Sequence, residues 1–342
     1  SATGDKQLAI GNGSDRWITG DSSFNVTIAG IATVTKATGV VQATKFCGDG
    51  SCLTGISAGF EQDADGNLFA GGGAGGGSYD PSSGTSCFNI FLGCNTGASI
   101  ANGDHNISLG CKAGCSLSTG CYNIIFGKEA GKNTNSGLDN IFLGRYAGEN
   151  TTNCGCNVFL GSEAGRCSDG QHNIFLGYTA GKGKSTVSDN TGGCNVNIGY
   201  TAGFCITSGC DNVIIGKDTA RCIETGCGNV YIGKEAGLYS CMCLCNVFVG
   251  AEAGKCSDGS FNVAIGLGAG KGSDTHPDNT GACNVSLGVC AGKCLVTGCD
   301  NVFIGSLAGE CHCCGNGNTI IGHDAGKNLC GGDRNLFLGQ YA

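Results

Sequence analysis

The chain has 342 residues, of which 66 are Gly and 27 are Cys, whereas only 2 are Pro and 13% are charged. Short runs of Val, Ile, Phe and Thr lie between Gly and Asn, which predicts an all-β protein. The net charge of −8 and the lack of Lys/Arg clusters leave no attraction for phosphate, so we expect neither nucleic acid nor a membrane surface as a partner. No apolar run could span a bilayer, and a start at Ser1 without Met or signal peptide is typical of a processed or partial product.

Residues 1–66 read as strands with Gly turns, for example FNVTIAGIATVTKATGVVQATKF at 24–46. We predict a β-rich fibre or assembly segment over residues 1–66 and a Cys-rich repeat shaft over residues 67–342. The stretch from Asp63 to Asn67 begins like a calcium loop but lacks the remaining ligands at the required spacing. We interpret it as the turn that leads into the first repeat.

A pattern of Asn, Val/Ile, any residue, Leu/Ile, Gly, two of any residue, Ala and Gly then repeats along the chain. It starts at Asn67, Asn89, Asn106, Asn123, Asn140, Asn157, Asn173, Asn195, Asn212, Asn229, Asn246, Asn262, Asn284, Asn301, Asn318 and Asn335. Most spacings are 17, with a few of 16 or 22, and residues 157–245 and 246–334 are two copies of one 89-residue block. This period predicts a β-solenoid of about sixteen coils, roughly 75 Å long at a strand spacing of roughly 4.8 Å.

Each repeated position has a predicted structural role. The Asn should hydrogen-bond the Asn of the coils above and below it, which satisfies its amide in a ladder. Gly161 should turn a corner where a Cβ would clash or a positive φ is needed, and Ala164 and Gly165 should allow close approach at a second corner. Val158 and Leu160, two residues apart, should face the inside of the coil.

The residue between these two positions is then expected to face outward. It is apolar or aromatic in most coils, as in Phe91, Phe142, Phe159, Phe175, Ile214, Tyr231, Phe248, Phe303, Ile320 and Phe337. A strand that is apolar on both faces is normally buried on both, and an exposed stripe of this length exceeds what soluble monomers tolerate. We therefore predict that copies of the chain pack along this stripe, most simply as a parallel homotrimer. A single-chain solenoid whose stripe is covered in another way, or another filament, is the alternative.

The cysteines indicate a disulfide framework in an oxidising, extracellular setting. Candidate pairs across one turn are Cys115 with Cys121, Cys205 with Cys210, Cys222 with Cys227, and Cys294 with Cys299. Stacked coils also place equivalent cysteines about 5 Å apart, within the reach of a disulfide. Pairing within a turn, between coils or between chains therefore stays open, and the odd count leaves at least one thiol unpaired within the chain.

Two cysteine clusters, Cys241 to Cys245 and Cys311 to Cys314, contain enough soft ligands for zinc or an iron–sulfur centre. They occupy the same corner as the other cysteines, and neither paired CxxC knuckles nor a CxxCH haem motif is present. We predict no metal and no cofactor.

We find no acid–base or nucleophile constellation among the five His, so we predict that the protein is not an enzyme. A carbohydrate-cleaving groove with acids from distant coils is the one enzymatic alternative. Lys128/Glu129 and Lys234/Glu235 should lie on a solvated outer face. Three coils carry insertions, at residues 75–87, 181–194 and 270–283, which we interpret as surface bulges, with receptor contact as the alternative.

The stretch GVVQATKFCGDGSCLTGI at 39–56 resembles a motif of tail-fibre and virion structural proteins of tailed phages. The Asn-x-x-Ile-Gly-x-x-Ala-Gly repeats are similar to those of phage tail fibres and bacterial surface fibres, and more distantly to the heads of trimeric autotransporter adhesins. The resemblance implies a trimeric fibre, and a disulfide between Cys47 and Cys52 would staple the Gly-Asp-Gly-Ser turn. The coil is longer than the autotransporter repeat, and the cysteine density is unusual for either group.

These observations together predict a structural component of an extracellular fibre or filament, stabilised by disulfides, on a virion tail or a cell surface. The alternative is an adhesin that binds a host glycan or receptor through the inserted loops.

Overall fold

The computed structural model describes residues 9–12, 15–20, 26–28, 61–63, 65–76, 86–185, 189–273 and 279–342. The chain divides into two compact units, Ser1–Ile56 and Ser57–Ala342. In the first unit, strands β1 (Ala9–Asn12), β2 (Asp15–Gly20) and β3 (Val26–Ile28) form an antiparallel sheet. In the second unit, β4 (Glu61–Gln62) pairs antiparallel with β5 (Leu68–Ala70), so residues 57–66 group with the coils rather than with the segment before them.

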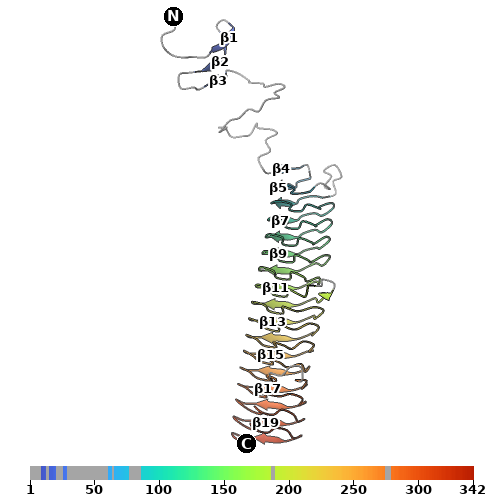
Figure 1. Cartoon of the computed structure of the whole chain (residues 1–342), viewed down its shortest axis with the longest axis vertical. Helices are drawn as coiled ribbons and strands as arrows, with labels where there is room; N and C mark the ends of the chain where they lie inside the picture. Colours follow the sequence, from blue (N-terminus) through green and yellow to red (C-terminus); the bar gives the residue numbers. More distant parts are fainter. Residues whose placement is uncertain are drawn as a thin grey trace. The chain divides into compact units, whose positions relative to one another are not determined.

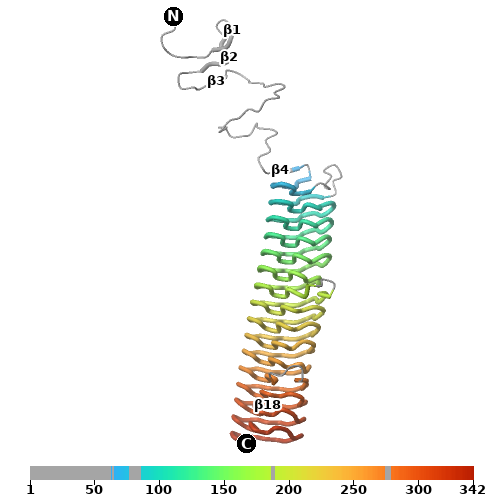
Figure 2. The backbone as a smooth tube through the Cα atoms, in the orientation of Figure 1, coloured from blue at the N-terminus to red at the C-terminus, as the bar shows by residue number. Residues whose placement is uncertain are grey.

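The second unit is a parallel β-solenoid, as predicted from the repeat (Figures 1 and 2). Each coil contributes one three-residue strand that pairs in register with the next, for example Val158 with Ile174. After β5 the strands are β6 (Ile90–Leu92), β7 (Ile107–Leu109), β8 (Ile124–Phe126), β9 (Ile141–Leu143), β10 (Val158–Leu160), β11 (Ile174–Leu176), β12 (Val196–Ile198), β13 (Val213–Ile215), β14 (Val230–Ile232), β15 (Val247–Val249), β16 (Val263–Ile265), β17 (Val285–Leu287), β18 (Val302–Ile304), β19 (Thr319–Ile321) and β20 (Leu336–Leu338). The described residues contain no helix.

A buried ladder of Asn side chains runs along the stack and confirms the predicted role of the repeated Asn. At every step from Asn89 to Asn335, the backbone N–H of the Asn donates to the Oδ1 of the Asn one coil earlier, at 2.7–3.1 Å. Asn212 shows the full pattern: its Nδ2 donates to Asn195 Oδ1 at 3.0 Å and to the carbonyl of Gly226, fourteen residues later in its own coil, at 2.8 Å. One side chain therefore closes its coil and joins it to the next.

Asp63 begins this ladder at the N-terminal end of the stack. Its carboxylate accepts hydrogen bonds from the backbone N–H and the Nδ2 of Asn67, both at 2.9 Å. The backbone N–H of Gly66 donates to the carbonyl of Asp63 at 3.3 Å, which closes a turn. The predicted turn into the first coil is confirmed, and Asp63 takes the place that the preceding Asn has in later coils.

The predicted orientation of the strands is wrong, because the middle residue of each strand points into the coil. The predicted stripe is buried in the core, with Phe91, Phe142, Phe159, Phe175, Ile214, Tyr231, Phe248, Phe303 and Ile320 all at 0–1% exposure and Phe337 half-buried in the last coil. Neighbouring rings stack: those of Phe142 and Phe159 are 5.0 Å apart, and those of Phe159 and Phe175 are 4.9 Å apart. Val158 and Leu160, predicted to be inside, lie on the outside and are half-buried by stacking. The internal stripe cannot be an oligomer contact.

Glycine makes the room that these rings need. Gly165 has φ +57°, and a Cβ there would come within 2.4 Å of the Phe159 ring. Gly161 has φ +136°, and a Cβ there would come within 2.4 Å of the Gly177 carbonyl in the next coil. The predicted corner roles of both glycines are confirmed, and the contact of Gly165 shows that a large ring fills the interior.

Replacing one ladder Asn tests how far the stack depends on it. Asn212→Ala removes the acceptor of the Asn229 backbone N–H and the donor to the Gly226 carbonyl, and leaves these groups buried. We expect the free energy of unfolding to fall by roughly 2–5 kcal/mol, measured as a lower urea midpoint by circular dichroism. Asn135→Ala, on an exposed side chain, is the matched control. Equal midpoints for the two variants would contradict the role of the ladder.

Candidate functional site

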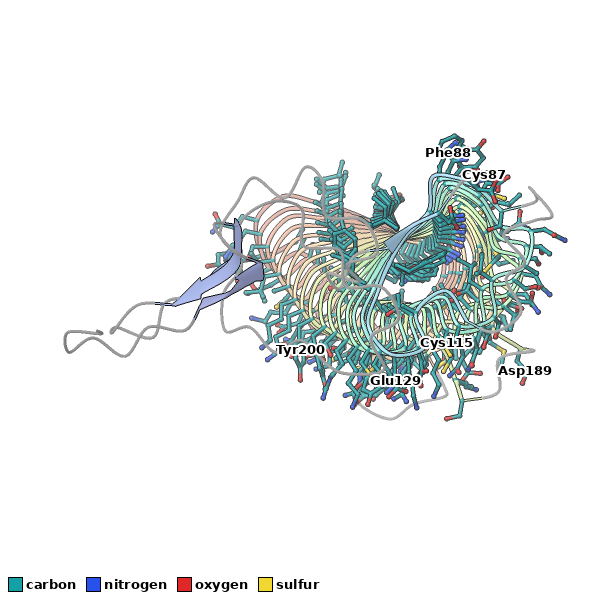
Figure 3. All side chains as sticks on the ribbon, turned by 90° about the horizontal axis from the view of Figure 1, so that it is seen from above. Cys87, Phe88, Cys115, Glu129, Asp189 and Tyr200 are labelled. Atoms are coloured by element: carbon teal, nitrogen blue, oxygen red, sulfur yellow. The ribbon has the colours of Figure 1, made fainter. Side chains whose placement is uncertain are left out.

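The residues that flank the buried ring form two outward columns, which we call the apolar face. The first column contains Ile90, Ile107, Ile124, Ile141, Val158, Ile174, Val196, Val213, Val230, Val247, Val263, Val285, Val302, Thr319 and Leu336, and the second contains Leu92, Leu109, Phe126, Leu143, Leu160, Leu176, Ile198, Ile215, Ile232, Val249, Ile265, Leu287, Ile304, Ile321 and Leu338. Only Thr319 among them is polar. Figure 3, which looks along the stack, shows side chains aligned in such columns.

The members of the apolar face are half-buried or exposed, because each side chain is covered only by its neighbours in the same column. Ile174 is 40% exposed and Ile265 is 44% exposed. None of the members carries a charge, so covering the apolar face would bury no charged group. The outward apolar surface expected from the sequence therefore exists, but on the residues either side of the predicted ones.

A charged belt lies on another side of the coil. Glu129 accepts from Lys132 at 3.0 Å, and Glu235 from Lys255 at 2.7 Å. Lys128 and Lys234, beside Glu129 and Glu235, are 58% and 59% exposed, so the predicted solvated outer face is confirmed. Figure 3 shows Glu129 on the outer rim of the coil. The carboxylates of these pairs are only 16–19% exposed, whereas the neighbouring Lys128 and Lys234 reach into solvent and keep this side of the stack hydrated.

The predicted disulfide candidates lie in separate columns. Cys47 and Cys52 lie outside the described residues. Counted from the repeated Asn, the ninth or tenth position holds Cys115, Cys205, Cys222 and Cys294, and the fifteenth holds Cys121, Cys210, Cys227 and Cys299. Cys87 belongs to the second column, because its N–H donates to Asp104 Oδ1 at 2.7 Å and the N–H of Asp104 donates to Cys121 Sγ at 3.3 Å. Figure 3 shows Cys115 and Cys87 at different places on the perimeter, so the two columns are separated.

Like cysteines of successive coils do meet. The Sγ atoms of Cys210 and Cys227 are 2.7 Å apart, and the N–H of Cys210 donates to Cys227 Sγ at 3.1 Å. The proximity of Cys205 raises the pKa of Cys222, after the larger effect of burial. The structure therefore brings together cysteines that are 17 residues apart.

Four of the described cysteines, Cys154, Cys167, Cys243 and Cys256, are buried, and Cys154 and Cys243 among them share one coil position. Burial raises the pKa of the Cys154 and Cys243 thiols to about 12, and these side chains are 2% and 0% exposed. They occupy a position that is Gly in most coils, where a Cβ would strike a large neighbour: at Gly120 it would come within 2.6 Å of Leu117. In the two coils with Cys, the corresponding neighbour is the smaller Thr151 or Ser240.

The two clusters considered for metal binding are spread over different sides of the backbone. Cys241 is half-buried, Cys243 is buried and Cys245 is exposed. His312, beside Cys311 and Cys313, is buried and contacts the Leu329 carbonyl at 3.0 Å. Within the described part of the chain, no group of three or more His, Cys, Asp or Glu side chains is placed to hold a metal ion.

The bases of two inserted loops share one clamp. Asn190 accepts from the N–H of Lys184 at 3.0 Å and donates to its carbonyl at 2.7 Å. Asn279 makes the same two bonds to Ser273, at 3.0 and 2.8 Å. The part of each loop between these residues falls partly outside the described residues.

The chain matches no family model, no curated protein and no solved structure. Within the described ranges, no helix has the length and apolar character needed to cross a membrane.

The raised pKa values predict a large spread in thiol reactivity. In the folded, reduced protein at pH 8, a pKa of about 12 leaves little thiolate on Cys154 and Cys243, so we expect them to react with iodoacetamide about a hundredfold or more slowly than the exposed Cys94 and Cys111. Peptide mass spectrometry over a time course measures each rate. Unfolding in urea should equalise the rates, and equal rates in the folded protein would contradict the inward position of Cys154 and Cys243.

Proposed function

We propose that this chain is a structural component of an extracellular fibre or filament, a disulfide-stabilised shaft like that of a phage tail fibre or a cell-surface filament. The observation that supports this best is the Asn ladder, which continues through every coil from Asn67 to Asn335 and joins the coils into one hydrogen-bonded stack. The repeated positions are occupied by ladder, ring, corner and belt residues. These residues hold the coils together and keep them in register, so the proposal gives the chain a mechanical role rather than a catalytic one.

The apolar face is the surface that we propose for self-association with further copies of the chain. The fourteen spacings between its fifteen strands make the apolar face roughly 70 Å long, and two neighbouring columns of side chains make it about 10 Å wide. The resulting area of about 700 Å² exceeds the apolar patch of a typical monomer and approaches the ~800 Å² per partner of a standard interface. Copies that bring their apolar faces together, two face to face or three around an axis, remove this surface from water.

The proposed self-association is tested by placing a charge on the apolar face. We expect the full chain to sediment as a dimer or trimer, and to appear by electron microscopy as straight rods with a solenoid part about 75 Å long. Val213→Lys with Val247→Lys should yield monomers, because burying two ammonium groups in an apolar contact is costly.

The control variant for this test is Ala251→Lys, since the same coil position is Lys217 and Lys234 in earlier coils. It should leave the oligomer unchanged, and circular dichroism should show that all variants keep their β-structure. A monomeric wild-type chain, or an oligomer that survives both face substitutions, would refute self-association through this face.

An adhesin is the second candidate, and the shared Asn clamp favours it. Asn190 and Asn279 hold the bases of two insertions in the same way, through two hydrogen bonds each, so the base of each insertion is fixed. A fixed base lowers the ordering entropy that a loop loses when it binds a ligand. A host glycan or receptor is the partner that this alternative implies.

Shortening the loops separates the adhesin from the plain shaft. Deleting residues 185–189 and 274–278 should leave the urea midpoint within the error of the wild type, because each shortened coil then has the 17 residues of the common repeat. If the protein is a shaft only, neither form should bind on a glycan array or to host cells. Binding by the wild type that is lost in the deletion variant would establish the adhesin instead.

A further inference from the structure

Five pairs of cysteines occupy the same position in successive coils, 17 residues apart. They are Cys94 and Cys111, Cys205 and Cys222, Cys210 and Cys227, Cys294 and Cys311, and Cys313 and Cys330. Two of these pairs, Cys205/Cys222 and Cys210/Cys227, lie at one boundary, between the coil of β12 and the coil of β13. This boundary is therefore the richest in opposed thiols among the described coils.

The geometry of Cys210 and Cys227 is close to that of a bonded pair. Cys210 and Cys227 are at the ends of their coils, so each lies three positions before the strand of the following coil. Those strands are β13 and β14, in which Val213 and Val230 are in-register parallel partners. Parallel strands are about 4.8 Å apart, inside the 4.4–6.8 Å between Cα atoms that a disulfide accepts. Their Sγ atoms are already at 2.7 Å, and a bond of about 2.05 Å requires only a small closing movement.

The second pair, Cys205 and Cys222, lies at a different corner of the same boundary. The N–H of Cys205 donates to the carbonyl of Arg221 at 3.0 Å, which places Cys205 beside the residue that precedes Cys222. Both thiols of this pair are partly buried, and burial raises the pKa of each. Bridges within one turn, from Cys205 to Cys210 or from Cys222 to Cys227, would instead have to join the two separated columns (Figure 3).

We propose that Cys210 and Cys227 form a disulfide that staples two successive coils, and that Cys205 and Cys222 form a second staple at the same boundary. The oxidant is a low-molecular-weight disulfide. The Cys227 thiolate attacks one of its sulfurs and releases one thiolate, which gives a mixed disulfide. Cys210 then loses its proton to solvent, attacks the sulfur of Cys227 and releases the second thiolate. In total, two protein thiols lose two protons and two electrons, and the small disulfide is reduced to two thiols.

The order of attack follows from the hydrogen bond between the two sulfurs. This bond to Cys227 raises the pKa of Cys210 to about 12, so Cys210 stays protonated while Cys227 reacts first. The backbone N–H of Cys210 also donates to Cys227 Sγ at 3.1 Å, so both donors of Cys210 point at the sulfur that attacks first.

The staples would change how the stack unfolds. In a solenoid each coil contacts only its neighbours, so coils can separate one boundary at a time. A bridge between equivalent positions prevents the two coils from separating, whereas a bridge within one turn leaves the boundary free to open. This inference rests on the disulfide-stabilised shaft proposed above and specifies which cysteines stabilise it.

Tryptic mapping distinguishes the two pairings without any variant. Cys205 and Cys210 lie on peptide 185–217, which also contains Cys194, and Cys222 and Cys227 lie on peptide 222–234. Cys194 should carry one alkyl group, which is counted in the mass of its peptide. The full chain, refolded in reduced and oxidised glutathione, is alkylated, digested without reductant and measured by mass spectrometry. We expect one species that joins the two peptides and is lighter than their sum by the four hydrogens that two bridges remove.

Matched variants assign the bridges. Cys210→Ser should leave the peptides joined by one bridge, and Cys205→Ser with Cys210→Ser should separate them. Cys156→Ser, on an exposed cysteine whose equivalents in the adjacent coils are Asp139 and His172, should leave the joined species unchanged.

The possible failures are distinguishable. Separate peptides, each lighter by two hydrogens, would show bridges within a turn, which would overturn the staples and leave a disulfide-stabilised shaft standing. Fully alkylated peptides would also overturn the staples. If the urea midpoint of the wild type were then also the same with and without reductant, the proposal that disulfides stabilise the shaft would be refuted as well.

Discussion

The Asn ladder is the interaction on which the rest of the structure depends. From Asn89 on, each Asn donates its backbone N–H to the preceding Asn, and from Asn67 to Asn318 each Nδ2 also donates to a carbonyl 13, 14 or 19 residues later, depending on the length of the coil. Coil closure and coil stacking therefore use the same side chain, and neither can be lost without the other. Because these amides are buried, an unmade bond costs the full desolvation of a polar group, which fixes the register of every coil.

A fixed register turns every other coil position into a column. Rings stack on rings inside the coil, aliphatic side chains line most of the outside of the strand, and acids meet lysines along the belt. Asn197 stands in the ring column between Phe175 and Ile214 without a hydrogen-bond partner for its amide, and Ser108 and Ser286 stand in the same column, so the column tolerates small polar residues at several steps. The rings and the ladder together supply the cohesion of the stack, and the apolar face lies on its outside.

The cysteines follow the same geometry. A turn of five residues brings two cysteines close in sequence, whereas stacking brings residues 17 apart into contact. The sequence alone left both pairings open, because a short loop and a stacked column each satisfy the length of a disulfide. The contact between the sulfur atoms of Cys210 and Cys227 depends on the backbone path at the corner of each coil, and the packing of the whole coil sets that path.

The sequence by itself determined the class of fold, the length of each coil, the ladder and the corners at Gly161 and Gly165, because a repeat of constant length with Asn at one position can bury itself only by stacking in register. It could not determine which side of the strand faces inward. Alternation with a period of two separates Val158 and Leu160 from Phe159 but does not say which set is inside, and here both sets are apolar. Only the tertiary structure decided this, since the Gly165 corner leaves a space that the Phe159 ring fills and that Val or Leu would leave partly empty.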